Sequence, residues 1–357
     1  MTFDAPTLAG AAHGDAVFTL SVLPLRLLVR AAEARGVAVD ELAQSAGVPR
    51  EALQRRLGRL DSVQTVRLVA ELERRLPAAP LALEATEALD PRELGLLGLV
   101  VNAAETLGDA LRLGVRFFSL MHDSAELTVH LDDRFARVGL SSAVSPYAVP
   151  ALVELTFAAV ATLGRCLSQR EVCALEVRFS HPERVYRREL ELFFRAPVQF
   201  QAPRNELVFP AAYLDLPVPQ GNASTKRLLS DVAARFLASA TPEDELHRVR
   251  RALVRALRAG DASLPTVARS MGKSARTLQR RLQALGTTHQ ALLEDVRCSL
   301  ALHDLAVPGV EVSAVAAGLG FADGSTFARA FRRWTQSSPS AARLGGAPVS
   351  ARTPSCR

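Results

Sequence analysis

The sequence predicts a multidomain protein: an α+β N-terminal domain followed by an all-α C-terminal domain that contains two helix-turn-helix units. Strand-like segments alternate with helical segments up to residue 209, and the pattern is purely helical after Thr241. The charge is a third observation, because the excess of Lys and Arg over Asp and Glu lies mainly in the second part of the chain. The 357 residues are enough for two domains that each bury a core.

We expect five segments along the chain. They are a flexible tail at 1–21, the mixed domain at 22–217, a linker at 218–242, the helical domain at 243–344 and a second tail at 345–357. Pro217, Pro219, Gly221 and Asn222 mark the linker, which also has room for a helix over 224–238. Thr241 is a candidate N-cap for the first helix of the C-terminal domain, with Pro242 at the first helical position.

The N-terminal domain is predicted to begin with helices, because Leu23, Leu27 and Leu28 are spaced as on one helix face. Alternating apolar residues then predict a hairpin of two strands, 126–131 and 135–140, around a turn at 132–134. The other predicted elements are helices at 62–76, 91–121, 151–168 and 183–195, a strand at 172–179 and two short strands within 198–209.

The charge is divided unequally between the two domains. Residues 243–344 carry 15 Lys and Arg against 9 Asp and Glu, a net charge of +6, whereas residues 1–242 have a net charge of −2. A basic excess concentrated in one domain indicates a polyanionic partner, such as double-stranded DNA.

The first helix-turn-helix unit is predicted over residues 264–285. A helix at 264–271 is followed by a turn at 272–274 that contains a glycine, and by a second helix at 275–285 that Ser274 is placed to cap. The side chains predicted to pack between the two helices are Val267, Ala268, Leu278 and Leu282.

The outward face of the second helix in this unit carries side chains that recognise bases. Arg276, Gln279 and Arg280 are spaced i, i+3 and i+4, so they project together. Arg reads guanine and Gln reads adenine through paired hydrogen bonds in the major groove. Lys273 and Arg281 lie to the side of this face, where phosphate contacts are expected.

The second unit is predicted over residues 312–335, with helices at 312–319 and 324–335 joined by a turn at 320–323. Phe327, Phe331 and Trp334 recur at helical spacing, which favours a hydrophobic core over base stacking. The outward side chains are Ser325, Ala328 and Arg329 as base-reading candidates and Arg332 and Arg333 as phosphate-binding candidates. A helix at 288–306 between the units is long enough to place two recognition helices about one DNA turn, roughly 34 Å, apart.

These residues resemble the AraC/XylS family of bacterial transcription regulators. The resemblance covers about residues 243–344 and rests on SARTLQRRL at 274–282, on Val296 and Arg297, and above all on VAAGLGFADGSTFARAFRRW at 315–334. It implies that Arg276, Gln279 and Arg280 are the base-reading residues of the first unit. For the second unit it implies the same role for Gly324, Ser325, Ala328 and Arg329.

The sequence departs from the family pattern in two places. The stretch QSSPSAAR at 336–343 keeps the proline and the arginine of the usual closing motif but lacks its glycine and tyrosine. The second recognition helix also offers small side chains where longer polar ones are common in the family. We therefore expect the first unit to contribute more base specificity and the second unit to contribute more backbone contact.

Residues 22–217 resemble, more weakly, the arabinose-binding-type sensory domain found in some members of the same family. The matching stretches are TLGDALR at 106–112, FSHP at 179–182, FFRAPVQF at 193–200, NELVFP at 205–210 and LDLP at 214–217. The resemblance implies a pocket for a small-molecule effector and dimerisation into a homodimer, and contact with RNA polymerase if the protein activates transcription. The domain has no Trp and few aromatic residues, which favours an apolar or amino-acid-like effector over a sugar; no pocket residue is predicted.

An internal similarity leaves two interpretations open. AQSAG at 43–47 and LQRRL at 53–57 match ARSMG at 268–272 and LQRRL at 278–282 at a constant offset of 225 residues. The segment is either a third helix-turn-helix that contacts DNA or a helical corner packed inside the N-terminal domain. We favour the helical corner, because such corners recur in helical proteins.

The sequence predicts no enzymatic activity, no catalytic residue, no cofactor and no metal site. His122 and His181 have no nucleophile in a recognisable motif, and Asp132 with Asp133 falls in a turn where Asp is common for backbone reasons. The four cysteines are scattered, there is no secretory signal, and no apolar run is long enough for a membrane helix, so we expect a cytoplasmic protein without a membrane partner.

Two alternative functions remain at this stage. The first is a ligand-independent architectural or recombination-type DNA-binding protein, which the size of residues 22–217 disfavours because such a protein needs no pocket-bearing domain. The second is an enzyme fused to a regulator, which turnover by the N-terminal domain would reveal.

Overall fold

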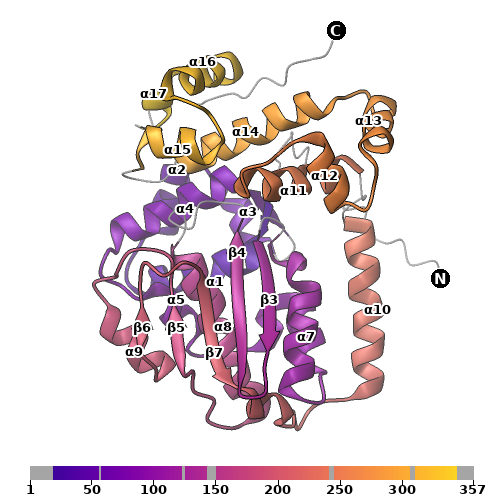
Figure 1. The fold of residues 1–357 in the computed structure, drawn as a ribbon. Helices are drawn as coiled ribbons and strands as arrows, with labels where there is room; N and C mark the ends of the chain where they lie inside the picture. The colour runs from indigo at the N-terminus through magenta and orange to yellow at the C-terminus, as the bar shows by residue number, and fades with distance from the viewer. Residues whose placement is uncertain are drawn as a thin grey trace, which may run out of the picture.

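The computed structural model describes residues 19–55, 58–122, 125–142, 150–240, 245–305 and 310–343 (Figure 1). Strands and helices alternate up to residue 210, and every described element after residue 245 is a helix. This confirms the α+β domain followed by an all-α domain. In Figure 1 the C-terminal helices lie above the N-terminal domain.

The N-terminal domain combines two sheets with helices. Its strands are β1 (Thr19–Ser21), β2 (Arg59–Asp61), β3 (Ala125–Leu131), β4 (Phe135–Ser142), β5 (Glu176–Arg178), β6 (Val198–Gln199) and β7 (Asn205–Pro210). Its helices are α1 (Val22–Ala34), α2 (Val39–Ala46), α3 (Arg50–Gln54), α4 (Ser62–Arg75), α5 (Leu81–Thr86), α6 (Gly95–Asn102), α7 (Leu107–Phe117), α8 (Pro150–Ser168) and α9 (Arg187–Phe194), with 3₁₀ helices η1 (Pro91–Leu94), η2 (Phe118–Leu120) and η3 (Ala211–Asp215).

The larger sheet has the strand order β3-β4-β7-β5-β6, in which only the β5–β6 pair is parallel. The predicted hairpin is confirmed as β3 and β4, and Asp132 forms its turn. The Asp132 carboxylate accepts hydrogen bonds from the backbone N–H groups of Arg134 and Phe135, at 2.9 and 2.8 Å. This local bonding explains an aspartate at the turn without any catalytic role.

Three predicted elements differ from the structure. The strand expected at 172–179 is limited to β5, because only Glu176–Arg178 pairs with neighbouring strands. The helix expected at 91–121 is divided into η1, α6, α7 and η2, since Gly95 adopts a positive φ of 58° and Thr106 caps a new helix at α7. Residues 19–21, which the sequence placed in the flexible tail, form β1 and pair with β2.

The side chains of the N-terminal domain bury two apolar clusters. One lies among α1–α5, and the other lies among the larger sheet and helices α6–α9. Helix α8 contributes to both clusters through Leu155 and Phe157. Among the described helices, α8 alone is long and apolar enough to cross a membrane, but 61% of its apolar window is buried inside the protein, as in a core helix.

The segment predicted as a linker contains a long helix, α10 (Ala223–Ala240), which runs upright along one side of the N-terminal domain in Figure 1. Ala233 is fully buried, and Leu229, Ala234 and Phe236 pack against the second cluster. The helix contacts α6. Most of residues 218–242 therefore belong structurally to the N-terminal domain, because one face of α10 is apolar enough to pack there.

The C-terminal domain consists of α11 (Glu245–Arg258), α12 (Leu264–Ser270), α13 (Ala275–Ala284), α14 (His289–Leu305), α15 (Val312–Gly318), α16 (Gly324–Thr335) and α17 (Pro339–Arg343). These helices share one core. The predicted cap Thr241 and Pro242 lie outside the described residues.

The two domains contact each other. Helix α14 packs on α4, and Val310 contacts both the first N-terminal cluster and the C-terminal core. Arg255 of α11 also lies 4.0 Å from Glu126 of β3, with both side chains largely exposed. The C-terminal domain is thus in physical contact with the N-terminal domain through α11, α14 and Val310.

Candidate nucleic-acid interface

The first helix-turn-helix unit consists of α12 and α13. The turn between them uses Gly272 at a φ of +65°, a left-handed conformation that glycine adopts without steric cost. The backbone N–H of Lys273 donates to the carbonyl of Ala268 at 2.9 Å, which closes the end of α12. The hydroxyl of Ser274 accepts a hydrogen bond from Thr277 N–H at 3.1 Å, so the predicted N-cap of α13 is confirmed.

Apolar side chains fix the angle between α12 and α13. The four side chains predicted to pack between these helices are all fully buried in one cluster, which confirms the prediction: Val267, Ala268, Leu278 and Leu282. With one face of α13 buried in this way, the opposite face is directed to solvent. Arg276, Gln279 and Arg280 are exposed there, and so is Arg281, while Lys273 is half-buried.

The second unit, α15 and α16, repeats the same backbone geometry. Gly320 has a φ of +72°, and Phe321 N–H donates to the carbonyl of Ala316 at 3.1 Å. The Asp323 carboxylate caps α16 by accepting from Thr326 N–H at 2.7 Å, and the hydrogen bonds from Thr326 hold the pKa of this carboxyl below its usual range.

The core of the second unit is aromatic. Phe327 and Phe331 are fully buried and Trp334 is half-buried, as predicted. Phe321 adds a fourth ring, whose centroid lies 5.4 Å from that of Phe327 and 6.0 Å from that of Trp334. These rings have an internal packing role, which leaves them unavailable for base stacking.

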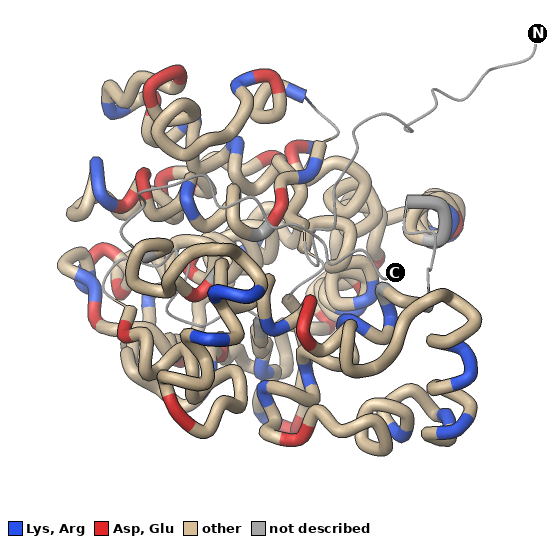
Figure 2. The backbone as a smooth tube through the Cα atoms, turned by 90° about the horizontal axis from the view of Figure 1, so that it is seen from above, with Lys and Arg blue, Asp and Glu red and all other residues tan. Residues whose placement is uncertain are grey.

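The outward face of α16 is less polar than that of α13. Ser325 and Arg329 are exposed, whereas Ala328 is half-buried. Arg332 and Arg333 are also exposed, and Arg333 forms an ion pair with Glu294 of α14 at 3.0 Å. Figure 2 looks down on the C-terminal helices and marks the Lys and Arg residues along them.

Helix α14 connects the two units, and Arg297 on this helix positions the second turn. Its Nε donates to the carbonyl of Leu319 at 3.0 Å, and its guanidinium lies over the ring of Phe321, 5.0 Å from the centroid. Gly320 itself is favoured at this turn by its φ of +72°, which L side chains rarely adopt. The 17 residues of α14 span about 26 Å.

The N-terminal corner, residues 39–54, has the same turn but not the same second helix. Gly47 has a φ of +66°, and Val48 N–H donates to the carbonyl of Ala43 at 2.9 Å, as at the two C-terminal turns. Helix α3, however, has only five residues and ends before Arg55, and Leu53 is buried in the first N-terminal cluster. Arg56 and Leu57 lie outside the described residues.

A buried polar cluster joins α8, α4 and the segment after β5. Tyr186 donates to Glu154 at 2.9 Å, Arg184 donates to Tyr186 at 2.8 Å, and Arg184 also pairs with Glu73 at 2.7 Å. His181 Nδ1 lies 2.9 Å from a backbone carbonyl, and its Nε2 lies 3.5 Å from Glu154. Burial raises the pKa of Glu154 to about 7 and lowers the pKa of His181 to about 4. Glu154 and His181 are both fully buried, so the cluster links elements inside the domain.

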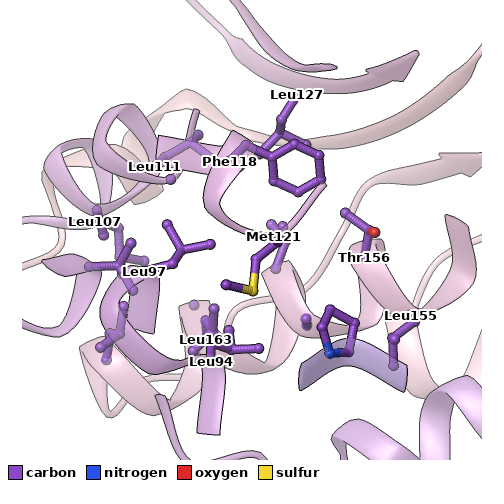
Figure 3. Close-up of a pocket in the computed structure, with 18 of the residues that line it drawn as sticks. Leu94, Leu97, Leu107, Leu111, Phe118, Met121, Leu127, Leu155, Thr156 and Leu163 are labelled. Atoms are coloured by element: carbon purple, nitrogen blue, oxygen red, sulfur yellow. The ribbon is translucent and has the colours of Figure 1, made fainter. Parts of the chain in front are cut away.

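The N-terminal domain also contains an apolar cavity, for which the sequence predicted no residues. It has a volume of about 170 Å³ and lies among α1, α6, α7, α8, η2 and β3 (Figure 3). Its lining residues are mainly leucines, which in a sequence cannot be told apart from core leucines.

Two family models match the chain. The arabinose-binding domain of AraC transcription regulators, N-terminal part, matches residues 36–218, and a helix-turn-helix domain matches residues 267–344. The ornithine utilization regulator of Pseudomonas aeruginosa is 31% identical over 313 residues, which are 85% of this chain and 90% of that protein. An uncharacterized HTH-type transcriptional regulator of Mycobacterium bovis is 29% identical over 332 residues, which are 89% and 94% of the two chains.

A solved structure is also similar. The crystal structure of the transcriptional regulator CdpR from Pseudomonas aeruginosa aligns with a TM-score of 0.43 and 23% identity, over 90% of this chain and 98% of that chain.

The N-terminal model covers about half of the chain, and the match to the ornithine utilization regulator extends over both domains. The helix-turn-helix model thus covers both units that the geometry defines. The chain belongs to the AraC family of transcription regulators, with an arabinose-binding-type domain in front of its DNA-binding helix-turn-helix domain.

Proposed function

We propose that this regulator binds its operator in double-stranded DNA through two unequal units, of which the first reads most of the sequence. Arg276, Gln279 and Arg280 are the base-reading residues of the first unit. The observation that carries this assignment is their shared exposure on the face of α13 opposite the buried Leu278 and Leu282. On that face they are able to enter the major groove together, where Arg and Gln form paired hydrogen bonds with base edges.

The second unit contacts a neighbouring groove segment through Ser325, Ala328 and Arg329. The small side chains of Ser325 and Ala328 reach few base atoms. This unit therefore helps to position the protein on the DNA more than it discriminates between sequences. The phosphate contacts come from Lys273, Arg281, Arg332 and Arg333. Arg333 has to exchange its ion pair with Glu294 for a phosphate, which its 63% side-chain exposure permits.

A small-molecule effector bound to the N-terminal domain controls operator binding. The contact between α4 and α14, with Val310 packed on both cores, supplies a route between the two domains. An effector that favours one arrangement of this contact changes the orientation of the DNA-binding helices by shifting the population.

We further infer a cytoplasmic homodimer that contacts RNA polymerase if it activates transcription. The homodimer is supported by α10, where Leu228 and Val232 lie one turn apart with 65% and 44% of their surface exposed. Analytical ultracentrifugation of the wild type and of Leu228→Lys tests the dimer. An unchanged sedimentation coefficient would exclude this face as the contact.

Selection of bound DNA from a random pool, with the full chain as bait, tests the proposed function. The expected result is one enriched sequence whose strongest positions contact the first unit, because the longer polar side chains lie there. Enrichment with and without cell extract reports the need for an effector.

Arg276→Ala and Ser325→Ala provide matched variants in this selection. We expect Arg276→Ala to change the enriched bases and Ser325→Ala to leave them nearly unchanged. The absence of any enriched sequence, with constitutive binding to all DNA, would instead support an architectural DNA-binding protein.

A further inference from the structure

The cavity in the N-terminal domain is lined almost entirely by apolar side chains. Figure 3 shows Met121 and Phe118 projecting into it, with Leu97 on one side and Leu155 and Thr156 on the other. The wall comes from elements that are distant in sequence, from β1 to η3. A site of this kind stays free of ordered water, because it offers few hydrogen-bond partners.

Polar groups in the wall are few. Among the described lining residues only His122, Thr156 and Tyr213 have polar side chains, and none is an Asp, Glu, Lys or Arg. The Thr156 hydroxyl donates to the backbone carbonyl of Leu152 at 2.8 Å, and the His122 ring is stacked on Phe118. With three polar side chains and no charged one among its described residues, the wall can serve few polar groups of a ligand and no charged group.

This chemistry selects among effector classes. An amino acid carries an ammonium and a carboxylate, and each loses hydration on entry without a charged partner in the described wall. A sugar carries hydroxyls around its whole ring, which need more hydrogen-bond partners than the three polar side chains offer. An apolar molecule loses few hydrogen bonds to water on entry, and the transfer of its apolar surface out of water is favourable.

The cavity is also connected to the DNA-binding domain. Leu20, Leu27, Leu152 and Leu155 line it and belong to the cluster against which Val310 packs. Leu127 of β3 lines the cavity as well. Its neighbour in that strand, Glu126, lies 4.0 Å from Arg255 of α11. An occupant therefore touches members of the apolar cluster against which Val310 packs at the contact between the domains.

From these observations we propose that the effector binds in this cavity and is a neutral, mainly apolar molecule with few polar groups, rather than an amino acid or a sugar. This inference rests on the proposed function, since it identifies the ligand class of the same regulator. The ligand's polar part faces His122, Thr156 or Tyr213, and its apolar part lies among the leucines and Met121.

Gly114 provides a sharp test. This residue of α7 lines the cavity, and a Cβ added there meets no atom within 4 Å. Gly114→Phe fills the cavity without a clash at its Cβ, whereas Gly114→Ala also replaces the helical glycine and leaves the cavity open. The probes are decanol and the neutral dye N-phenylnaphthylamine, with L-ornithine and L-arabinose as the polar comparison, each tested by calorimetry and thermal shift on the full chain.

We expect both apolar probes to bind the wild type and Gly114→Ala, to raise their melting temperatures and to change their operator affinity. Gly114→Phe should bind the probes at least about tenfold more weakly, because the ring occupies their place. The operator affinity of Gly114→Phe should not respond to the probes, whereas that of Gly114→Ala should respond as in the wild type.

Three results would overturn the inference. They are probe binding by Gly114→Phe that equals that of the wild type, stabilisation by ornithine or arabinose but not by the apolar probes, and probe binding without any change in operator affinity. Failure of the wild type to bind any specific DNA would contradict the proposed function instead. The two proposals are thus separable, since the calorimetry with apolar probes requires no DNA.

Discussion

The two helix-turn-helix units of this regulator have the same backbone and different surfaces. Gly272 and Gly320 adopt the same left-handed turn, and in both units a buried alanine accepts the hydrogen bond that closes the first helix. The first unit, however, packs with aliphatic side chains and presents three long polar ones, whereas the second packs with aromatic rings and presents mainly small ones. The turn and the core thus determine the fold of a unit, while its exposed face determines what it reads.

The N-terminal corner extends this comparison. It shares the turn at Gly47, yet its second helix is half as long as α13 and its Leu53 is buried in the N-terminal domain. The turn is therefore a general way to join two short helices. A long second helix with an exposed polar face is the feature that distinguishes a DNA-reading unit.

The largest expected difference concerns the cores of the two units. Phe327→Ala should lower the free energy of unfolding by about 3–5 kcal/mol, and Leu278→Ala by about 2–5 kcal/mol, because each leaves a cavity at a fully buried position. We expect Phe327→Ala to cost more, since it also removes contacts with two neighbouring rings. Chemical denaturation followed by Trp334 fluorescence measures both. A larger loss for Leu278→Ala would contradict the view that the aromatic unit is the more tightly packed one.

The next largest effect concerns base reading. Arg276→Ala should weaken binding to the selected operator by about 1–3 kcal/mol and relax the base preference at one position. Arg329→Ala should weaken it by less, because the face of α16 makes fewer base contacts. Fluorescence anisotropy with the operator and with single-base variants measures both. Equal losses of specificity would show that the two units read DNA to the same extent.

Phosphate contacts should respond differently. Arg281→Ala is expected to weaken binding to all sequences alike and to lower the slope of log affinity against log salt by about 1. Titrations at several salt concentrations, on the operator and on random DNA, separate this effect from that of Arg276→Ala. If both variants lose the same affinity on random DNA, the assignment of the recognition face of α13 is wrong.

A smaller effect concerns the helix caps. Asp323 caps α16 with a carboxylate whose folded pKa lies below its unfolded value, whereas Ser274 caps α13 with a hydroxyl. The contribution of Asp323 is therefore present above its unfolded pKa and is lost as the pH falls through its folded pKa. Acid titration of the Thr326 and Thr277 amide signals by NMR should show the loss at α16 only. Asp323→Asn, which retains a capping oxygen, should remove that pH dependence.

The N-terminal corner should show no effect on DNA binding. Replacing Arg55 and Arg56 by Ala is expected to leave the operator affinity and its salt dependence unchanged, because α3 ends before Arg55 and its apolar face is buried. The same anisotropy titrations test this. Weaker, less salt-sensitive binding would mean that the corner is a third DNA-contacting unit.

Much of the fold was predictable from local patterns. The hairpin at Asp132, the cap at Ser274 and the aromatic core of the second unit all depend on residues close together in the sequence, and the structure confirms each of them. The shortening of β5 was not predictable, because the extent of this strand depends on its pairing with strands elsewhere in the fold.

The sequence by itself determined the family, the two units and the side chains available to read DNA, because a helix-turn-helix is specified within about 20 consecutive residues. Tertiary structure alone decided which leucines surround a cavity and which fill the core, since both are apolar residues at similar spacings. It also decided that α10 packs on the N-terminal domain and that Arg297 supports the turn at Gly320. These features depend on contacts between segments that are far apart in the chain, and a local sequence pattern does not predict such contacts.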